Sequence, residues 1–557
     1  MPLRDPAVVM RLARLGSFHQ CRLSFMRTLL RRMKRDSWTF ERPVFEIDEK
    51  GVGIAVYSAC GPERTYSLVC FGHDLPPEHR SDRVIAHAWD STFTLFDGAP
   101  TPADIERLHW NVPKQEAGRI SNREISISRA NRSVRLFEHV VDSLAAGRQP
   151  DRDQIEAVGY LMRTTAVYGS GKFGAADREA IADRPEFAAP FQAEMLSVFL
   201  TRAFTIDLVE HLARARAPET AVRVDQALRR RFSVGNSTGL GLAPFIVNHP
   251  VLLNNWIAAR EEALARVRSL PRAAAEKALT FGAMLARARI SAEEWRSEHS
   301  LQIQKLIMLR ADLARLQVHI ANGALDGEAP WDRLYGWAEA NLSIEGQEQL
   351  VSLMLEPYDE LVDDLADRMG ADEDMAFRID GAMSLDRLSG ILDEIYGWAL
   401  KIDWTSPDSL ARVWYVSEEK LEPRLGERFE EPIEPYEQPL APGRDAATLR
   451  REIEAWDGDR TVAAFLLRHP EHRHIVRRAQ IATRFPYAEI RDNTISAALL
   501  PIDLLRCKLA FFGATHFDPR SDRWVRINMF QNAPFPHELS EGDADDWSYP
   551  SLPEAME

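Results

Sequence analysis

The sequence has few cysteines, no long apolar segment and neither of the common nucleotide-binding fingerprints. Its 557 residues include four cysteines, none in a Cys-x-x-Cys pair, which argues against a disulfide framework and fits a reducing compartment. No apolar run approaches the roughly 18 residues that cross a bilayer, and the N-terminus lacks the apolar core of a signal peptide. We therefore predict a soluble, cytoplasmic protein without an integral membrane segment, and the sequence assigns no cofactor.

Acidic residues outnumber basic ones, and the net charge of −15 argues against a nucleic-acid partner. The segment 1–35 has the opposite balance, because it is rich in arginine and its apolar residues recur at helical spacing. Such a basic amphipathic helix lies on an anionic membrane or nucleic acid, acts as a mitochondrial-type presequence, or docks on the protein's own acidic surface. The acidic remainder of the chain favours docking.

Local patterning predicts a small sheet followed by many helices. Strands are expected at 38–48, 52–60 and 65–72, where β-branched and aromatic residues dominate between turn signals. A C-terminal hairpin is expected from the runs 508–517 and 523–530, and it should join or flank that sheet. Helices are expected near 82–98, 124–146, 151–167, 187–216, 219–232, 250–268, 272–289 and 291–322, between 331 and 400, and near 446–480. The predicted fold class is α+β, predominantly α-helical, with a small antiparallel sheet packed against a large helical body.

A segment rich in proline and glutamate at 418–443 marks a predicted domain boundary. The predicted organisation is a basic helix with the meander over 1–147, a helical domain with glycine-rich loops over 148–417, this arm or linker, and C-terminal helices with a hairpin and acidic tail over 444–557. The tetrapeptide at 80–83 recurs at 520–523, either as a structural repeat or as similar turn chemistry. A homo-oligomer is compatible with the sequence.

Two glycine-rich loops are the main candidates for ligand binding, because small residues, hydroxyls and backbone N–H groups suit an anion. The first is Tyr168-Gly-Ser-Gly-Lys-Phe-Gly174, in which Ser170 and Lys172 would contact a phosphate or carboxylate. It departs from a P-loop because Phe173 follows the lysine, because the first glycine is replaced by Ala166, and because a helix is expected before it. The alternative is a turn between two helices.

The second loop, 235–241, offers Asn236, Ser237 and Thr238 together with free backbone amides. His249 precedes Pro250 at the expected start of a helix, where unpaired N–H groups attract anions. The dinucleotide fingerprint is missing, and no βαβ unit is expected around this loop.

His73 and Asp74 follow an expected strand and form a candidate acid–base pair, in which the carboxylate would orient the imidazole. The alternative is a turn-capping aspartate beside a surface histidine.

Metal sites receive little support from the sequence. His469, His472 and His474 lack the H-E-x-x-H spacing of a zinc helix, and a solvated helix start explains them. Asp363-Asp-Leu-Ala-Asp367 resembles the DDxxD motif of isoprenoid-diphosphate enzymes, whose magnesium site needs a second acidic motif that is missing here. We predict no metal site.

These observations favour an enzyme of unknown reaction class that acts on a small anionic, carboxylate- or phosphate-containing substrate between the loops 168–174 and 235–241. The alternative is a non-catalytic scaffold or regulatory protein that docks partners through its basic N-terminal helix and its Pro/Glu-rich arm.

Overall fold

A computed structural model describes most of the chain. The described residues are 2–16, 18–80, 88–112, 121–164, 181, 183–236, 249–370, 377–404, 414–417, 422–425, 442–491, 506, 508–521, 524–539 and 547–549.

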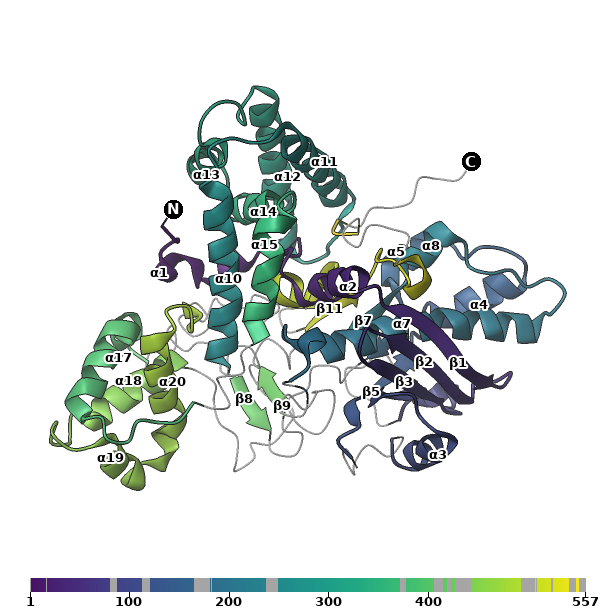
Figure 1. Cartoon of the computed structure of the whole chain (residues 1–557), viewed down its shortest axis with the longest axis horizontal. Helices are drawn as coiled ribbons and strands as arrows, with labels where there is room; N and C mark the ends of the chain where they lie inside the picture. The colour runs from purple at the N-terminus through teal and green to yellow at the C-terminus, as the bar shows by residue number, and fades with distance from the viewer. Residues whose placement is uncertain are drawn as a thin grey trace.

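The structure contains one curled, mixed sheet of nine strands, most of which lies in the right half of the view in Figure 1. Its order is β1-β2-β3-β4-β5-β6-β7-β11-β10. All neighbours are antiparallel except β6 and β7, which run parallel. The strands are β1 (Thr39–Ile47), β2 (Gly53–Cys60), β3 (Thr65–Gly72), β4 (Ser91–Asp97), β5 (Glu124–Arg132), β6 (Tyr160–Thr164), β7 (Ser233–Asn236), β10 (His516–Ser521) and β11 (Trp524–Met529).

The predicted fold class is therefore wrong, because the sheet is neither small nor antiparallel throughout. Strands β4, β5 and β6 lie in segments for which helices were expected, and they extend the N-terminal meander across the molecule. The C-terminal hairpin β10–β11 does pair into this sheet, but through β7, at the edge opposite β1.

The two faces of the sheet carry different cores, because side chains alternate along each strand. Cys70 and Phe93 face the main core with the buried helix α7 (Gln192–Arg216), whereas Phe71 and Phe96 face a smaller cluster with α3 (Pro102–Asn111). Figure 1 shows α3 on the other side of the strands from α7. Both faces are thus covered, as strands with apolar residues on both sides require.

Helices dominate the rest of the structure. On the sheet side lie α4 (Phe137–Ala145), α5 (Arg152–Val158) and α8 (Gln226–Arg231). A helical layer follows with α10 (Pro250–Arg268), α11 (Ala275–Glu294), α12 (Ser300–Ala321), α13 (Pro330–Asn341), α14 (Ile344–Leu355) and α15 (Asp359–Val362), then a 3-10 segment, Asp363–Gly370.

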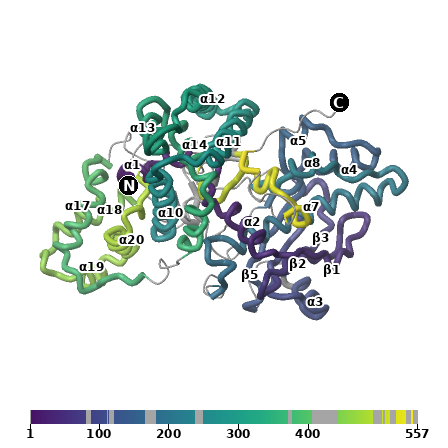
Figure 2. Tube along the Cα trace, turned by 45° about the horizontal axis from the view of Figure 1, so that its top comes forward, coloured from purple at the N-terminus to yellow at the C-terminus, as the bar shows by residue number. Residues whose placement is uncertain are grey.

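Four further helices form a separate group, which Figure 2 shows at one end of the molecule. They are α17 (Leu385–Leu400), α18 (Pro442–Ile453), α19 (Val462–Arg468) and α20 (Arg473–Arg484). Their side chains build a core of their own, drawn from both sides of the segment 418–443. The short strands β8 (Trp414–Ser417) and β9 (Glu422–Leu425) pair with each other. The predicted domain division is not tested by these contacts and stays a prediction.

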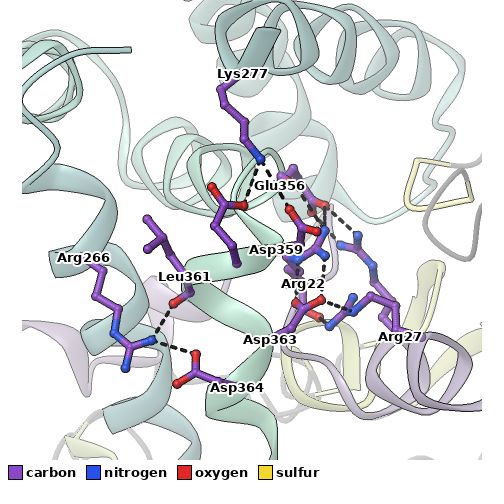
Figure 3. A network of polar contacts seen from close by, with 11 residues as sticks. Arg22, Arg27, Arg266, Lys277, Glu356, Asp359, Leu361, Asp363 and Asp364 are labelled. Atoms are coloured by element: carbon purple, nitrogen blue, oxygen red, sulfur yellow. Dashed lines mark hydrogen bonds and ion pairs between the residues drawn. The ribbon is translucent and has the colours of Figure 1, made fainter. Parts of the chain in front are cut away.

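The basic N-terminal segment docks on the protein's own acids. Its helix α2 (Phe25–Arg35) is largely buried, and Figure 3 shows Arg22 and Arg27 directed at Glu356 and Asp363. Arg27 and Glu356 are 2.6 Å apart, and Arg22 and Asp363 are 2.8 Å apart. This confirms the docked interpretation of the helix.

The same contacts account for the acidic stretch at 363–367. Asp363 pairs with Arg22 and Arg31, and Asp367 pairs with Arg32. Asp364 pairs with Arg266 (Figure 3). These carboxylates are neutralised by arginines, which removes the high negative charge that a magnesium site needs.

Among helices of the described residues, none combines the length and the apolar character needed to cross a bilayer.

Candidate functional site

Each strand of the parallel pair β6–β7 comes before one of the two glycine-rich loops in the chain. Tyr160 is in register with Ser233, and Arg163 with Gly235. Parallel strands end at the same edge, so the chain leaves β6 for the loop 168–174 next to where it leaves β7 for the loop 235–241. In mixed and parallel sheets, ligands bind in the crevice beyond these carboxyl ends.

Two expectations about the loops are wrong in this light. The loop 168–174 follows a strand, β6, and not a helix, because the predicted helix 151–167 ends at Val158 and the chain turns at Gly159 into β6. A βαβ-type crossover also exists, since β6 and β7 are parallel neighbours with α7 between them in the chain. One of the three objections to a phosphate-binding loop at 168–174 is thereby removed.

The second loop begins inside the sheet. Gly235 and Asn236 are the last residues of β7, and Asn236 is fully buried. A Cβ atom on Gly235 would collide with the ring of Tyr160 in β6. Glycine at 235 is therefore explained by close packing between the parallel strands.

Of the other predicted ligand contacts, Ser170, Lys172, Ser237 and Thr238 lie outside the described residues. His249 precedes α10 as its N-cap residue and is partly exposed.

The predicted acid–base pair is not assembled in the structure. His73 follows β3, and its Nε2 lies 2.9 Å from Thr92 Oγ1. Asp74 is exposed, and no contact joins it to the imidazole. Burial and the neighbouring His109 lower the pKa of His73 below its ordinary value. Since β3 is three strands from β6, His73 lies roughly 14 Å from the loop edge at about 4.8 Å per strand.

A cleft of about 560 Å³ lies beside β7 and its neighbour β11. The cleft adjoins β7, because Asn528, which lines the cleft, is paired with Gly235. Its charged lining residues are Arg135, Arg231, Arg296, Arg526, Asp153, Glu156, Glu294 and Glu298.

One end of the cleft presents aromatic and amide groups. His516 stacks on Trp295 with ring centroids 4.8 Å apart. Asn528 Oδ1 and Trp295 Nε1 are buried and have no hydrogen-bond partner among the described residues. A buried polar atom without a partner costs free energy, so both atoms are available to a ligand that carries a donor and an acceptor.

Several groups near the site escaped the sequence analysis. Arg163 and Arg526 lie in β6 and β11, on either side of β7, and are 4% and 5% exposed. A charged residue inside the short apolar run Tyr-Leu-Met-Arg-Thr was the available signal for Arg163. No local pattern connects Arg526 with a strand that ends about 290 residues earlier.

A motif in the second loop was also missed. Gly235-Asn-Ser-Thr-Gly239 fits G-x-S-x-G, the pattern of a nucleophile elbow, in which the serine directly follows a strand. β7 ends at Asn236, immediately before Ser237. The strand of the strand–turn–helix context that the motif requires is therefore present.

A second charged groove, of about 550 Å³, is lined by residues of α7 and β1. Arg42 and Arg229 pair there with Asp207 and Glu210. Arg214 and Arg223 are exposed at this groove, which makes it the rival anion site.

No family model, curated protein or solved structure matches this chain.

Proposed function

We propose that the protein is an enzyme that acts on a small anionic, carboxylate- or phosphate-containing substrate at the carboxyl ends of β6 and β7. The observation that carries the proposal is the parallel pairing of these strands, because both strands end at one edge of the sheet and each is followed in the chain by a glycine-rich loop. Ser170, Lys172, Asn236, Ser237, Thr238 and His249 remain the proposed substrate contacts.

Buried positive charge next to this edge supports the anionic character of the substrate. Arg163 and Arg526 flank β7 and are almost fully buried, and Arg526 donates to the backbone carbonyl of Ala157 at 2.6 Å. Arginine keeps its charge in proteins, and an anion is attracted more strongly in a low-dielectric site than in water.

The G-x-S-x-G segment favours one reaction class, acyl transfer with Ser237 as the nucleophile. In this class the serine oxygen attacks a carbonyl carbon, the leaving group departs, and water then hydrolyses the acyl-enzyme. The support is the strand that ends directly before Ser237. His73 and Asp74 lie three strands from β6, so this chemistry requires a base from another segment to take the serine proton.

The substrate site is tested by thermal unfolding with inorganic phosphate, pyrophosphate and succinate as probes. We expect at least one probe to raise the melting temperature of the wild type by a few degrees, roughly what about 2 kcal/mol of binding linkage produces. The double variant Lys172→Ala/Thr238→Ala should lose this shift and keep its melting temperature without ligand.

Two controls make the result specific. Lys401→Ala removes an exposed lysine at the end of α17 and should keep the full shift. If Arg214→Ala/Arg223→Ala abolishes the shift instead, the anion binds at the rival groove and the proposed site is wrong. The same holds if Lys172→Ala/Thr238→Ala leaves the shift unchanged.

A further inference from the structure

A cluster of metal-ligand side chains lies in the helical group α17–α20, away from the proposed substrate site. His469 Nδ1 is 3.4 Å from Glu452 Oε2 and 3.4 Å from Glu471 Oε1. One donor atom from each residue lies within 4.8 Å of the others, and within the described ranges no other such group of three forms. Glu452 belongs to α18, whereas His469 and Glu471 lie between α19 and α20.

We propose that Glu452, His469 and Glu471 bind a divalent first-row transition metal ion, with Zn²⁺ as the expected ion. Nitrogen and oxygen ligands hold zinc at about 2.0–2.1 Å, so the ligand atoms of a tetrahedral site are about 3.3 Å apart. The two distances from the imidazole agree with this spacing. An imidazole ligand favours zinc and its neighbours over calcium or magnesium, which take oxygen ligands.

The imidazole is held in place by its surroundings. Its ring stacks on Phe465 at 4.8 Å and meets the edge of Trp456 at 5.7 Å. The backbone N–H of His469 donates to the carbonyl of Phe465 at the end of α19. These contacts fix the ring with Nδ1 toward the two carboxylates.

A neighbouring histidine supports one of the carboxylates. His472 is 6% exposed, and its Nε2 lies 2.7 Å from Glu452 Oε2. Hydrogen bonds of this kind orient a ligating carboxylate and raise metal affinity. His472 thus acts as a positioning residue, and three protein ligands leave a fourth position for water.

The ion would connect α18 with the segment between α19 and α20. Glu452 lies near the end of α18, and the other two ligands belong to the connection between α19 and α20. Binding to the folded state alone stabilises that state by mass action, so zinc should act chiefly on stability.

The test uses the full-length protein, stripped with a chelator and titrated with Zn²⁺ by calorimetry at neutral pH. We expect one ion bound per chain and a higher melting temperature. With Co²⁺ the site should give the visible absorption of tetrahedral cobalt. Glu452→Gln and Glu471→Gln keep the side-chain shape and should weaken binding at least about tenfold.

Two nearby substitutions serve as matched controls and should bind zinc like the wild type. His474→Gln removes an exposed histidine that pairs with Asp445. Glu454→Gln removes a carboxylate directly after the end of α18, where it pairs with Arg450. Glu471 is itself exposed, so Glu471→Gln remains informative should Glu452→Gln fold poorly. Absence of zinc binding to the wild type overturns the proposal, and so does unchanged binding in both glutamine variants, because His469 would then be only an ion-pair partner.

Discussion

His19 is a buried histidine whose titration should control the stability of the folded chain in mild acid. It is 5% exposed, and burial together with the charge of Arg260 lowers its pKa from 6.5 to about 4. His19 therefore binds a proton near pH 6.5 in the unfolded chain, but only near pH 4 in the folded chain. The contribution of His19 is fully present above pH 6.5 and is lost as the pH falls toward 4.

We predict that wild-type protein loses about 2 kcal/mol of unfolding free energy through His19 between neutral pH and about pH 5. In the His19→Gln variant, the unfolding free energy should fall by about 2 kcal/mol less over this pH range. Chemical denaturation at the two pH values measures the difference. His79→Gln, at an exposed position, should behave like the wild type. Equal pH sensitivity of His19→Gln and wild type would contradict the prediction.

The neighbouring Glu348 titrates in a different range, so the two effects can be separated. Burial alone would raise its pKa, but Arg4, Arg260 and Arg14 lower it to about 2. Its contribution is fully present above its ordinary pKa of 4.5 and is lost only as the pH falls from there toward 2.

At the scale of elements, the strand that ends before Ser237 makes the proposed acyl-transfer chemistry testable. A fluorophosphonate probe forms a bond between phosphorus and an activated serine oxygen as fluoride leaves. We predict that wild-type protein is labelled at one residue, Ser237, and that Ser237→Ala abolishes labelling, as read by mass spectrometry of the peptide 233–249. Ser233→Ala, in the same strand, should retain labelling. A labelled site elsewhere, or none, would contradict the reaction class while leaving the anion site to its own test.

Local patterns predicted some elements of the sheet and missed others for a physical reason. The strands β1 to β3 and the C-terminal hairpin are expected from β-branched runs between turns. β4 was missed because Trp89, Phe93 and Phe96 also fit helical spacing, although the alternation Thr-Phe-Thr-Leu is typical of a strand. In β5, isoleucine and serine alternate over 125–128 in the same way.

The candidate site depends on exactly the elements that local patterns could not supply. The residues of the loops 168–174 and 235–241 were identified from their glycine-rich composition. That both loops follow parallel strands depends on β6, a five-residue strand in a segment predicted as part of the helix 151–167. The register of β7 with β11 joins segments distant in the chain, and only long-range pairing fixes it. The spacing of His469, His472 and His474 likewise gave no sign of Glu452, which the fold brings to His469 from another helix, α18.

For the whole molecule, charge complementarity within the chain was the more predictable property. An arginine-rich segment and an acidic remainder imply docking, and the structure pairs Arg4 with Glu261, and Arg27 with Glu356. Side chains from both sides of the segment 418–443 share one hydrophobic core. A break in composition does not indicate such long-range packing, and the predicted domain division stays a prediction.

The helical group at 377–491 should fold on its own, because its core is separate from the main core. Leu392, Tyr396 and Phe465 are fully buried within it, and Arg478 and Glu489 form a buried ion pair at its C-terminal end. Its described apolar contacts with the body are a small cluster at Val251 and the burial of Tyr487 and Ile490 in the main core, which are fewer residues than its own core contains.

We predict that the fragment 377–491 is helical and unfolds cooperatively when produced alone, as measured by far-UV circular dichroism during heating. Within the fragment, Leu392→Ala should lower stability by about 2–5 kcal/mol through loss of core packing. Leu467→Ala should have little effect, since this side chain is 86% exposed. A fragment that melts without a cooperative transition would show that its core is completed by the body of the protein. Equal stability of the Leu392→Ala and Leu467→Ala fragments would show the same, because a packed core is destabilised only by loss of the buried leucine.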